Sequence, residues 1–188
     1  MISCLISTKK CIPRGHYEAV ETIDFNTLYH NVGKRLLLLD LDNTLIPYDV
    51  FEPTETHRDW IRQLQAIGYE IILVSNNHGL RIKRAQEVLD ITVVGSAKKP
   101  LKCGFKRAMR LASKHYEKAE VIVVGDQLMT DVYGAKRSGL DAILVQPIKR
   151  RSEKWYTRIL RKIETSVLRR IEKKYPEIYQ ELKLDERG

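Results

Sequence analysis

Hydrophobic residues gather in five short, uninterrupted runs of strand length. The runs are rich in Val, Ile and Leu and cover residues 35–40, 69–75, 91–95, 120–126 and 141–146. Strands with one face in water alternate apolar and polar residues, whereas uninterrupted runs are typical of strands that are covered on both faces. The pattern therefore predicts a parallel sheet.

The segments between these runs have helical character. Residues 53–68 place apolar side chains at spacings of four and three and end at a glycine, which often follows the last turn of a helix. Three further segments of this kind cover residues 78–90, 101–116 and 129–139. Because strands and helices alternate, we expect a doubly wound α/β domain with right-handed crossovers.

The last part of the chain has a different composition. Residues 149–174 hold eleven Lys or Arg against three Glu, and apolar residues recur there every four positions. This predicts a basic amphipathic helix, which Pro176 should interrupt. We therefore expect an α/β domain over residues 1–148 and a basic helical tail over residues 149–188.

The net charge and the cysteine content indicate which partners the protein could bind and in which compartment it could reside. The formal net charge of +9 favours an anionic partner: a polyanion, an anionic membrane face or a phosphorylated substrate. Cys4, Cys11 and Cys103 form neither a CxxC pair nor a Cys/His cluster, so we expect no disulfide framework and no zinc site. No apolar stretch has the length of a membrane span. We expect a cytoplasmic protein, with contact to the inner membrane face left open.

Polar residues end or follow four of the five apolar runs. In an open parallel sheet, ligands bind beyond the carboxyl ends of the strands, so these residues should face one crevice. They are Asp40 and Asp42 after the first run, Ser75, Asn76 and Asn77 after the second, Lys99 after the third, and Asp126 and Asp131 after the fourth.

The three carboxylates of Asp40, Asp42 and Asp126 beside one lysine would repel one another unless a hard divalent cation joined them, so we expect Mg²⁺. Such a site suits a phosphate. Lys99 would neutralise phosphoryl oxygens, Ser75 would donate a hydrogen bond, and one carboxylate would attack phosphorus to form an aspartyl phosphate. A second carboxylate two residues further along the chain would shuttle the proton.

The same residues resemble the motifs of the haloacid dehalogenase (HAD) phosphatases. In "DLDNTL", Asp40 is similar to the nucleophile, Asp42 to the general acid/base, and Thr44 to the residue that fixes the turn. Ser75 matches the second motif and Lys99, in "KKP", the third. The resemblance therefore implies a HAD-like Rossmannoid fold.

The fourth motif of the HAD phosphatases is matched by "GDQLMTD". The resemblance implies that Asp40, Asp126 and the backbone carbonyl of Asp42 hold the metal ion, with Asp131 as a supporting carboxylate behind them. It also implies that Asn76 and Asn77 lie at the substrate.

The motifs resemble more narrowly the bacterial YqeG-like, subclass IIIA phosphatases, which are similar to the phosphatidylglycerophosphate phosphatases of mitochondria. Asp40 and Ser75 are 35 residues apart, and Ser75 and Lys99 are 24 apart, which leaves no room for an inserted cap domain. An uncapped site suits a large or anchored substrate that excludes water itself. We therefore expect a lipid head group, such as that of phosphatidylglycerophosphate, as the substrate.

Some roles stay open at this point. Asn76 or Asn77 could cap the next helix, and Asp131 could only favour a helix dipole. Lys98 or Lys99 could be the catalytic lysine, and we prefer Lys99 because of its spacing to Pro100.

The substrate class and the role of the tail also stay open. A nucleotide, a sugar phosphate or a phosphoprotein would suit the same chemistry. The tail could pack its apolar stripe on the α/β domain, adsorb to an anionic membrane, or hold RNA or ribosomes while the phosphatase site is dispensable.

Overall fold

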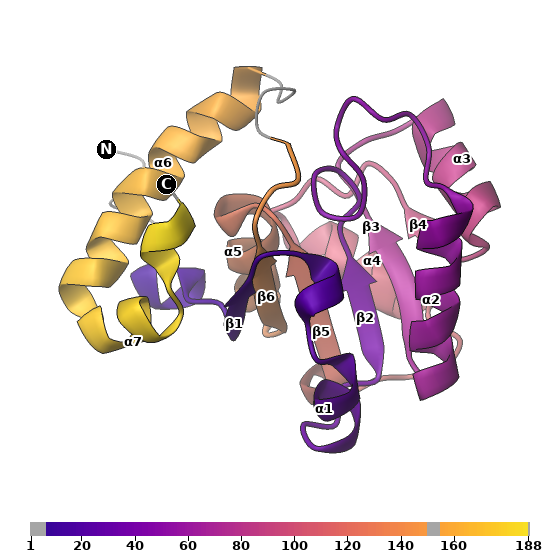
Figure 1. Cartoon of the computed structure of the whole chain (residues 1–188), viewed down its shortest axis with the longest axis horizontal. Helices are drawn as coiled ribbons and strands as arrows, with labels where there is room; N and C mark the ends of the chain where they lie inside the picture. The colour runs from indigo at the N-terminus through magenta and orange to yellow at the C-terminus, as the bar shows by residue number, and fades with distance from the viewer. Residues whose placement is uncertain (1–6, 150–154, 188) are drawn as a thin grey trace.

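A six-stranded sheet lies at the centre of the molecule (Figure 1). The computed structural model describes residues 7–149 and 155–187, without the side chains of residues 155–161 and 187. Every strand pair is parallel, in the order β1-β6-β5-β2-β3-β4. The strands are β1 (Gly15–Tyr17), β2 (Leu36–Leu39), β3 (Glu70–Val74), β4 (Thr92–Val94), β5 (Val121–Gly125) and β6 (Asp141–Val145).

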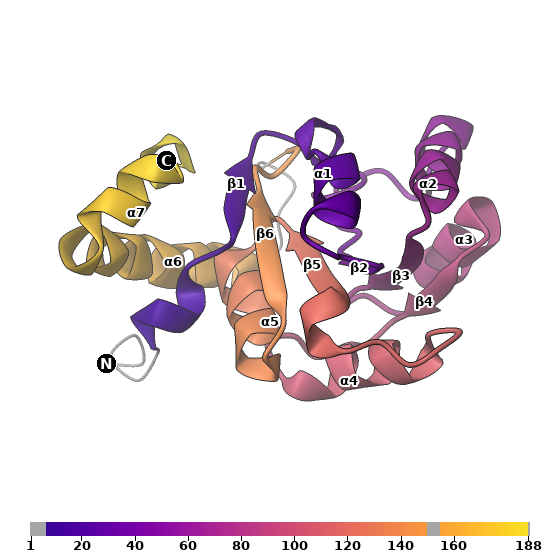
Figure 2. The ribbon, with the colours of Figure 1, turned by 90° about the horizontal axis from the view of Figure 1, so that it is seen from below.

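Helices cover both faces of the sheet (Figure 2). The helices are α1 (Phe25–His30), α2 (Glu55–Ile67), α3 (Leu80–Leu89), α4 (Lys102–Leu111), α5 (Tyr133–Ser138), α6 (Trp155–Lys174) and α7 (Pro176–Glu181). Two hydrophobic clusters result, one beneath α4, α5 and α6 and the other beneath α1, α2 and α3. The predicted doubly wound α/β fold with a parallel sheet is therefore confirmed.

Strand β2 shows why its sequence is an uninterrupted run of leucine. Leu36 and Leu38 belong to the cluster under α4 and α5, whereas Leu37 and Leu39 belong to the opposite cluster. All four side chains are fully buried. Successive side chains of a strand point to opposite faces, so a strand at the centre of a two-sided core needs apolar residues at every position.

The order of the strands reverses beside β2. From β2 the chain adds β3 and β4 on one side, and then places β5 and β6 on the other, where β6 pairs with the earlier strand β1. In such sheets the connections diverge at the reversal point and leave a crevice at the carboxyl ends of the strands. Residues that follow β2 and β5 therefore meet there.

The structure differs from the predicted elements in four places. Strand β1 and helix α1 were not predicted, and α4 ends at Leu111 rather than near residue 116. The predicted helix over residues 129–139 begins as a π-helical turn over Leu128–Val132, before α5.

The connections on either side of β3 are short. The segment between β2 and β3 contains α2 as its only helix, and the segment between β3 and β4 contains α3 as its only helix.

The basic tail packs on the α/β domain over the part whose side chains are described. Val167 and Ile171 of α6 are fully buried in the cluster under α5, and Ile163 and Leu168 pack against that cluster. Of the alternatives for the tail, packing of the stripe is therefore the one that the structure shows for this part. The stripe positions at Trp155, Ile159 and Leu160 lie outside the described side chains.

Helix α7 begins at Pro176, so this proline interrupts the tail helix as expected. The division into parts 1–148 and 149–188 stays a prediction. Within the described chain, no helix has both the length and the apolar content needed to cross a bilayer.

Candidate active site

The turn after β2 separates the two aspartates of "DLDNTL". Asn43 adopts a left-handed conformation with φ of 60°, which asparagine tolerates better than most residues. The turn is held by hydrogen bonds from the Asn43 N–H to the carbonyl of Ile46 (2.7 Å) and from the Tyr48 N–H to the Asn43 side chain (3.1 Å). Asp40 is buried, whereas Asp42 is partly exposed.

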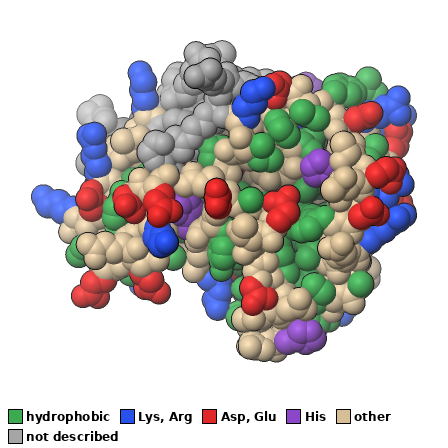
Figure 3. Space-filling view, in the orientation of Figure 1, with side chains coloured by type: hydrophobic (Ala, Val, Ile, Leu, Met, Phe, Trp, Pro, Cys, Tyr) green, Lys and Arg blue, Asp and Glu red, His purple; other side chains and the backbone are tan. Residues whose placement is uncertain are grey.

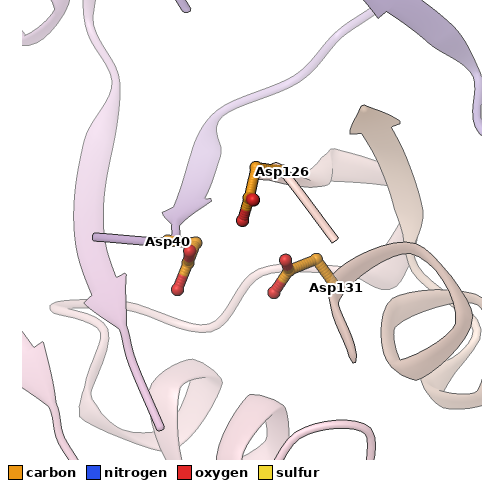
Figure 4. Close-up of side chains that lie close together, drawn as sticks. All are labelled: Asp40, Asp126 and Asp131. Atoms are coloured by element: carbon orange, nitrogen blue, oxygen red, sulfur yellow. The ribbon is translucent and has the colours of Figure 1, made fainter. Parts of the chain in front are cut away.

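Three buried carboxylates converge beyond the carboxyl ends of β2 and β5. Figure 4 shows Asp40, Asp126 and Asp131 pointing into a common space. One oxygen from each lies within 4.8 Å of the other two. Carboxylate oxygens in this arrangement are the ligands that Mg²⁺ and Ca²⁺ prefer, so the three side chains could hold a divalent cation.

Lys99 ties two of these carboxylates together. Its ammonium group donates to Asp40 Oδ1 and to Asp131 Oδ1, each at 2.6 Å, and its side chain is only 3% exposed. Burial alone would lower the pKa of Lys99, but the charges of Asp131 and Asp40 outweigh this effect and raise it. Lys99 therefore stays protonated.

The cluster has an excess of negative charge. Burial raises the pKa of Asp40 well above its usual value; Lys99 opposes this shift, and the carboxylates of Asp131, Asp126 and Asp42 add to it. Three carboxylates and one ammonium leave a formal charge of minus two, which a divalent cation would neutralise.

The hydroxyl of Thr44 links β2 to β5. It donates to Asp40 Oδ2 at 3.1 Å and accepts from the backbone N–H of Asp126 at 2.9 Å. Thr44 therefore positions the predicted nucleophile relative to a predicted metal ligand, beyond holding its own turn.

Asp131 lies in the cluster itself, not behind it. The π-helical turn carries its side chain toward β5, where Asp131 Oδ2 accepts from the Gln127 N–H at 3.0 Å. A Cβ atom on Gly125 would lie 2.4 Å from Asp131 Cγ, so only glycine leaves room for this carboxylate. The helix-dipole alternative does not describe these contacts.

The Asp42 carboxylate faces away from the cluster and toward the loop after β3. Ser75 Oγ donates to Asp42 Oδ2 at 3.0 Å, and Asn77 Nδ2 lies 3.1 and 3.2 Å from its two oxygens. The carboxylate of Asp42 is thus not among the three that converge. The metal contact expected of Asp42 was through its backbone carbonyl and stays a prediction.

Asn76 holds the backbone of Lys99 from both sides. Its Nδ2 donates to the Lys99 carbonyl at 3.1 Å, and its Oδ1 accepts from the Lys99 N–H at 2.7 Å. Neither Asn76 nor Asn77 caps α3, whose N-cap residue is Gly79. Lys98 is exposed, whereas Lys99 is buried at the carboxylates; the catalytic role of Lys99 stays a prediction.

Arg81, in the first turn of α3, was missed by the sequence reasoning. Its Nε and Nη2 both lie 2.9 Å from Asp42 Oδ1, and the same guanidinium donates to the backbone carbonyls of Pro47 and Val50. Arg81 therefore connects Asp42 to the loop between β2 and α2. Its position six residues after Ser75 was the only available signal, and spacing alone does not reveal this contact.

Comparison with known proteins places the chain in a family. The family profile described as "Mitochondrial PGP phosphatase" matches residues 1–149. The "Probable phosphatase YqeG" of Bacillus subtilis (strain 168) is 36% identical over 138 residues, which cover 73% of this chain and 78% of that protein.

A second relative is longer than this chain. It is the "Phosphatidylglycerophosphate phosphatase 1, chloroplastic/mitochondrial" of Arabidopsis thaliana, 28% identical over 174 residues, 85% of this chain and 47% of that protein. The chain thus spans about half the length of this relative.

A solved structure supports the fold alone. The hypothetical protein XCC2798 from Xanthomonas campestris superposes with a TM-score of 0.50 at 13% identity, covering 71% of this chain and 75% of that chain. The profile match and the Bacillus relative carry more weight, because the profile extends over the sheet and all of the residues around the carboxylate cluster, and the Bacillus relative is 36% identical over most of both chains. On these grounds the chain belongs to the mitochondrial PGP phosphatase family and is a HAD-type phosphatase, a phosphoric monoester hydrolase.

Proposed function

We propose that the protein is a Mg²⁺-dependent phosphatase that forms an aspartyl phosphate on Asp40 and acts on a phospholipid phosphate such as phosphatidylglycerophosphate. The observation that carries the proposal is the buried cluster of three carboxylates, two of which pair with Lys99. A structural cluster of this kind would be costly, because like charges in a buried site raise one another's free energy.

The residues of the cluster fit a magnesium ion. The donors are hard oxygen atoms, they come close enough together to share one ion, and their formal charge is not balanced by Lys99 alone. Asp40, Asp126 and Asp131 would hold the ion, with the backbone carbonyl of Asp42 as a further proposed ligand. A bound divalent cation would supply positive charge to the phosphoryl oxygens.

Asp40 is the proposed nucleophile. One of its carboxylate oxygens attacks phosphorus in line, so that an Asp40 oxygen–phosphorus bond forms as the bond from phosphorus to the ester oxygen breaks. Lys99 holds the Asp40 side chain in place and offsets the negative charge at the phosphate.

Asp42 is the proposed proton carrier. It gives a proton to the departing ester oxygen and then accepts one from the water that attacks the phosphoaspartate, which releases phosphate and restores Asp40. Ser75 and Asn77 hold the Asp42 carboxylate beside the turn, and both would offer hydrogen bonds to a phosphate that enters next to it. Asn76 supports the site by fixing the backbone of Lys99.

A lipid substrate is favoured by what surrounds the site. Only α2 and α3 occupy the segments in which a cap would be inserted, so a small substrate would stay exposed to water. A head group presented at a bilayer excludes water by itself. The name of the Arabidopsis relative points to the same class of substrate.

A substrate screen tests the proposal. With Mg²⁺ present, phosphate release is measured from phosphatidylglycerophosphate in vesicles, nucleotides, sugar phosphates and phosphopeptides, with Asp40→Asn as the blank. We expect release to be highest with the lipid and to fall at least about 10³-fold in Asp40→Asn. Higher turnover of soluble phosphates would contradict the lipid substrate, and full activity in Asp40→Asn would contradict the nucleophile.

A further inference from the structure

Large apolar side chains are exposed around the mouth of the active site. Among the described residues, six large apolar side chains are exposed, and five of them lie on segments that leave the carboxyl ends of strands. These five form what we call the apolar rim: Val50 and Phe51 after β2, Leu80 after β3, Leu101 after β4, and Ile148 after β6. Figure 3 shows hydrophobic side chains at the surface over the segment between β2 and α2.

Hydrogen bonds connect the rim to the catalytic turn. Arg81 bonds both the carbonyl of Val50 and the carboxylate of Asp42. The Ile148 N–H donates to the carbonyl of Asn43, at 3.0 Å. The rim therefore borders the site and is not a patch elsewhere on the surface.

Basic side chains accompany the rim. Residues 91–116 contain seven Lys or Arg and neither Asp nor Glu. Lys98 and Lys102 of this stretch are exposed next to Leu101. A surface with apolar side chains at its edge and exposed lysines beside Leu101 matches the interface of an anionic bilayer, where apolar groups enter the acyl boundary and cations meet the head groups.

The basic tail offers no comparable surface over its described side chains. Val167 and Ile171 of α6 are fully buried against the α/β domain, so these apolar residues cannot enter a bilayer while the fold is intact. The apolar rim, in contrast, is exposed in the folded protein. Exposed apolar groups around a polar centre commonly mark an interaction site.

We propose that the apolar rim, with Lys98 and Lys102, docks the protein on an anionic lipid bilayer with the active site facing the membrane. This orientation would bring a lipid phosphate to Asp40 without withdrawing the acyl chains from the bilayer. The role of this docking in catalysis rests on the proposed lipid phosphatase function. The docking itself can be measured on vesicles that contain no substrate.

Vesicle binding provides the test. The 188-residue chain is sedimented with vesicles of phosphatidylglycerol and phosphatidylcholine, and with vesicles of phosphatidylcholine alone. The double variant Phe51→Ser/Leu101→Ser should bind anionic vesicles at least about tenfold more weakly. Leu101 is the N-cap residue of α4, a position where serine is favoured, so this substitution does not threaten the helix.

Matched controls come from the other end of α4. Leu111 is 52% exposed, against 50% for Leu101 and 51% for Phe51, but it lies at the end of α4 remote from the site. Leu111→Ser should leave binding unchanged. Lys102→Gln should weaken it about fivefold, the effect expected of one basic residue near the surface, whereas Arg110→Gln should not.

The outcomes separate docking from substrate choice. Docking is supported if Phe51→Ser/Leu101→Ser loses vesicle binding but still hydrolyses soluble p-nitrophenyl phosphate. This conclusion holds whichever phosphate ester is the natural substrate. If docking follows this pattern but no lipid phosphate is released, the lipid substrate fails and docking stands. The inference would be overturned if the protein bound neutral vesicles as strongly as anionic ones, or if Leu111→Ser lost as much binding as Phe51→Ser/Leu101→Ser. It would also be overturned if the apolar rim governed self-association or RNA binding in place of vesicle binding.

Discussion

Two clusters of charged side chains lie at opposite ends of the same sheet. At the carboxyl ends, the carboxylates of Asp40, Asp126 and Asp131 lie close together, and one buried lysine, Lys99, pairs with Asp40 and Asp131. At the amino ends the ratio is reversed, because one carboxylate, that of Asp141, meets three cations: Lys34 at 2.7 Å, Lys136 at 3.1 Å and Arg14 at 3.3 Å.

The clusters differ in whether their charges are satisfied. The buried ammonium of Lys34 donates to Asp141 and also to the carbonyls of Ala119 (2.6 Å) and Val121 (3.3 Å), and Asp141 remains 30% exposed to water. This cluster is complete without a ligand. The carboxylate cluster is almost fully buried, so water does not offset its excess negative charge; access to water, more than the number of charges, therefore distinguishes the candidate binding site from the structural network.

Magnesium should affect only one of the clusters. At a concentration about 100 times its Kd, a ligand stabilises the folded state by about 2.7 kcal/mol, which would raise the Tm of a chain of this size by roughly 5–10 °C. We expect this rise in the unsubstituted protein and its near loss in Asp126→Asn. Asp141→Asn should start from a lower Tm and keep the rise, as measured by differential scanning calorimetry.

An undiminished magnesium effect in Asp126→Asn would show that the ion binds elsewhere. The carboxylate cluster would then not be the magnesium site.

Arg81 should affect turnover more than stability. Lysine keeps the charge but donates from a single nitrogen, so Arg81→Lys cannot reproduce the separate contacts that the guanidinium nitrogens make with Asp42 and the carbonyl of Val50. We expect kcat for a soluble aryl phosphate to fall about 10- to 30-fold, with a smaller change in KM and an unchanged Tm.

The neighbouring Arg84 provides the control, because it is exposed on the same helix and pairs with Glu87 at 3.1 Å. Arg84→Lys should leave kcat unchanged. Equal kcat values for the two variants would mean that Asp42 does not depend on Arg81.

Asp141 should contribute stability with a defined pH dependence. Burial tends to raise its pKa, but hydrogen bonds from Lys34 and Lys136 outweigh this and lower the pKa from 3.8 to about 2. Because the folded pKa is the lower one, the contribution is complete above about pH 4 and is lost as pH falls toward 2. Asp141→Asn should reduce the free energy of unfolding by about 1 kcal/mol at pH 7, after allowance for solvent screening.

Urea unfolding between pH 2 and pH 7 measures this effect. The difference between Asp141→Asn and the unsubstituted protein should shrink as pH approaches 2. A difference that stays constant over this range would assign the stabilisation to packing and not to charge.

The sheet was predictable because its strands are buried on both faces. In β2 and β5 every residue is apolar or glycine and buried, so the pattern is continuous. Strand β1 could not be found in this way. It has three partly buried residues, Gly15, His16 and Tyr17, and its strand conformation depends on backbone pairing with β6, which leaves no mark on the side-chain pattern.

The candidate site was predictable where a residue ends a strand. Asp40, Ser75 and Asp126 follow strands directly, so the topology places them together. Arg81 and the exact position of Asp131 were not predictable, because they depend on how a loop folds back and on a π-helical turn. The apolar stripe of the tail was recognised, but its periodicity could not reveal which surface would cover Val167 and Ile171.

The hydroxyl of Thr44 has a consequence for how the active site assembles. It joins the side chain of Asp40 to the backbone of Asp126, two positions that are distant in the chain but follow adjacent central strands. If β2 and β5 separate, the nucleophile and the metal ligand separate with them, so a partly unfolded molecule cannot keep a partly working site. Enzymatic activity should therefore disappear in step with cooperative denaturation of the central sheet.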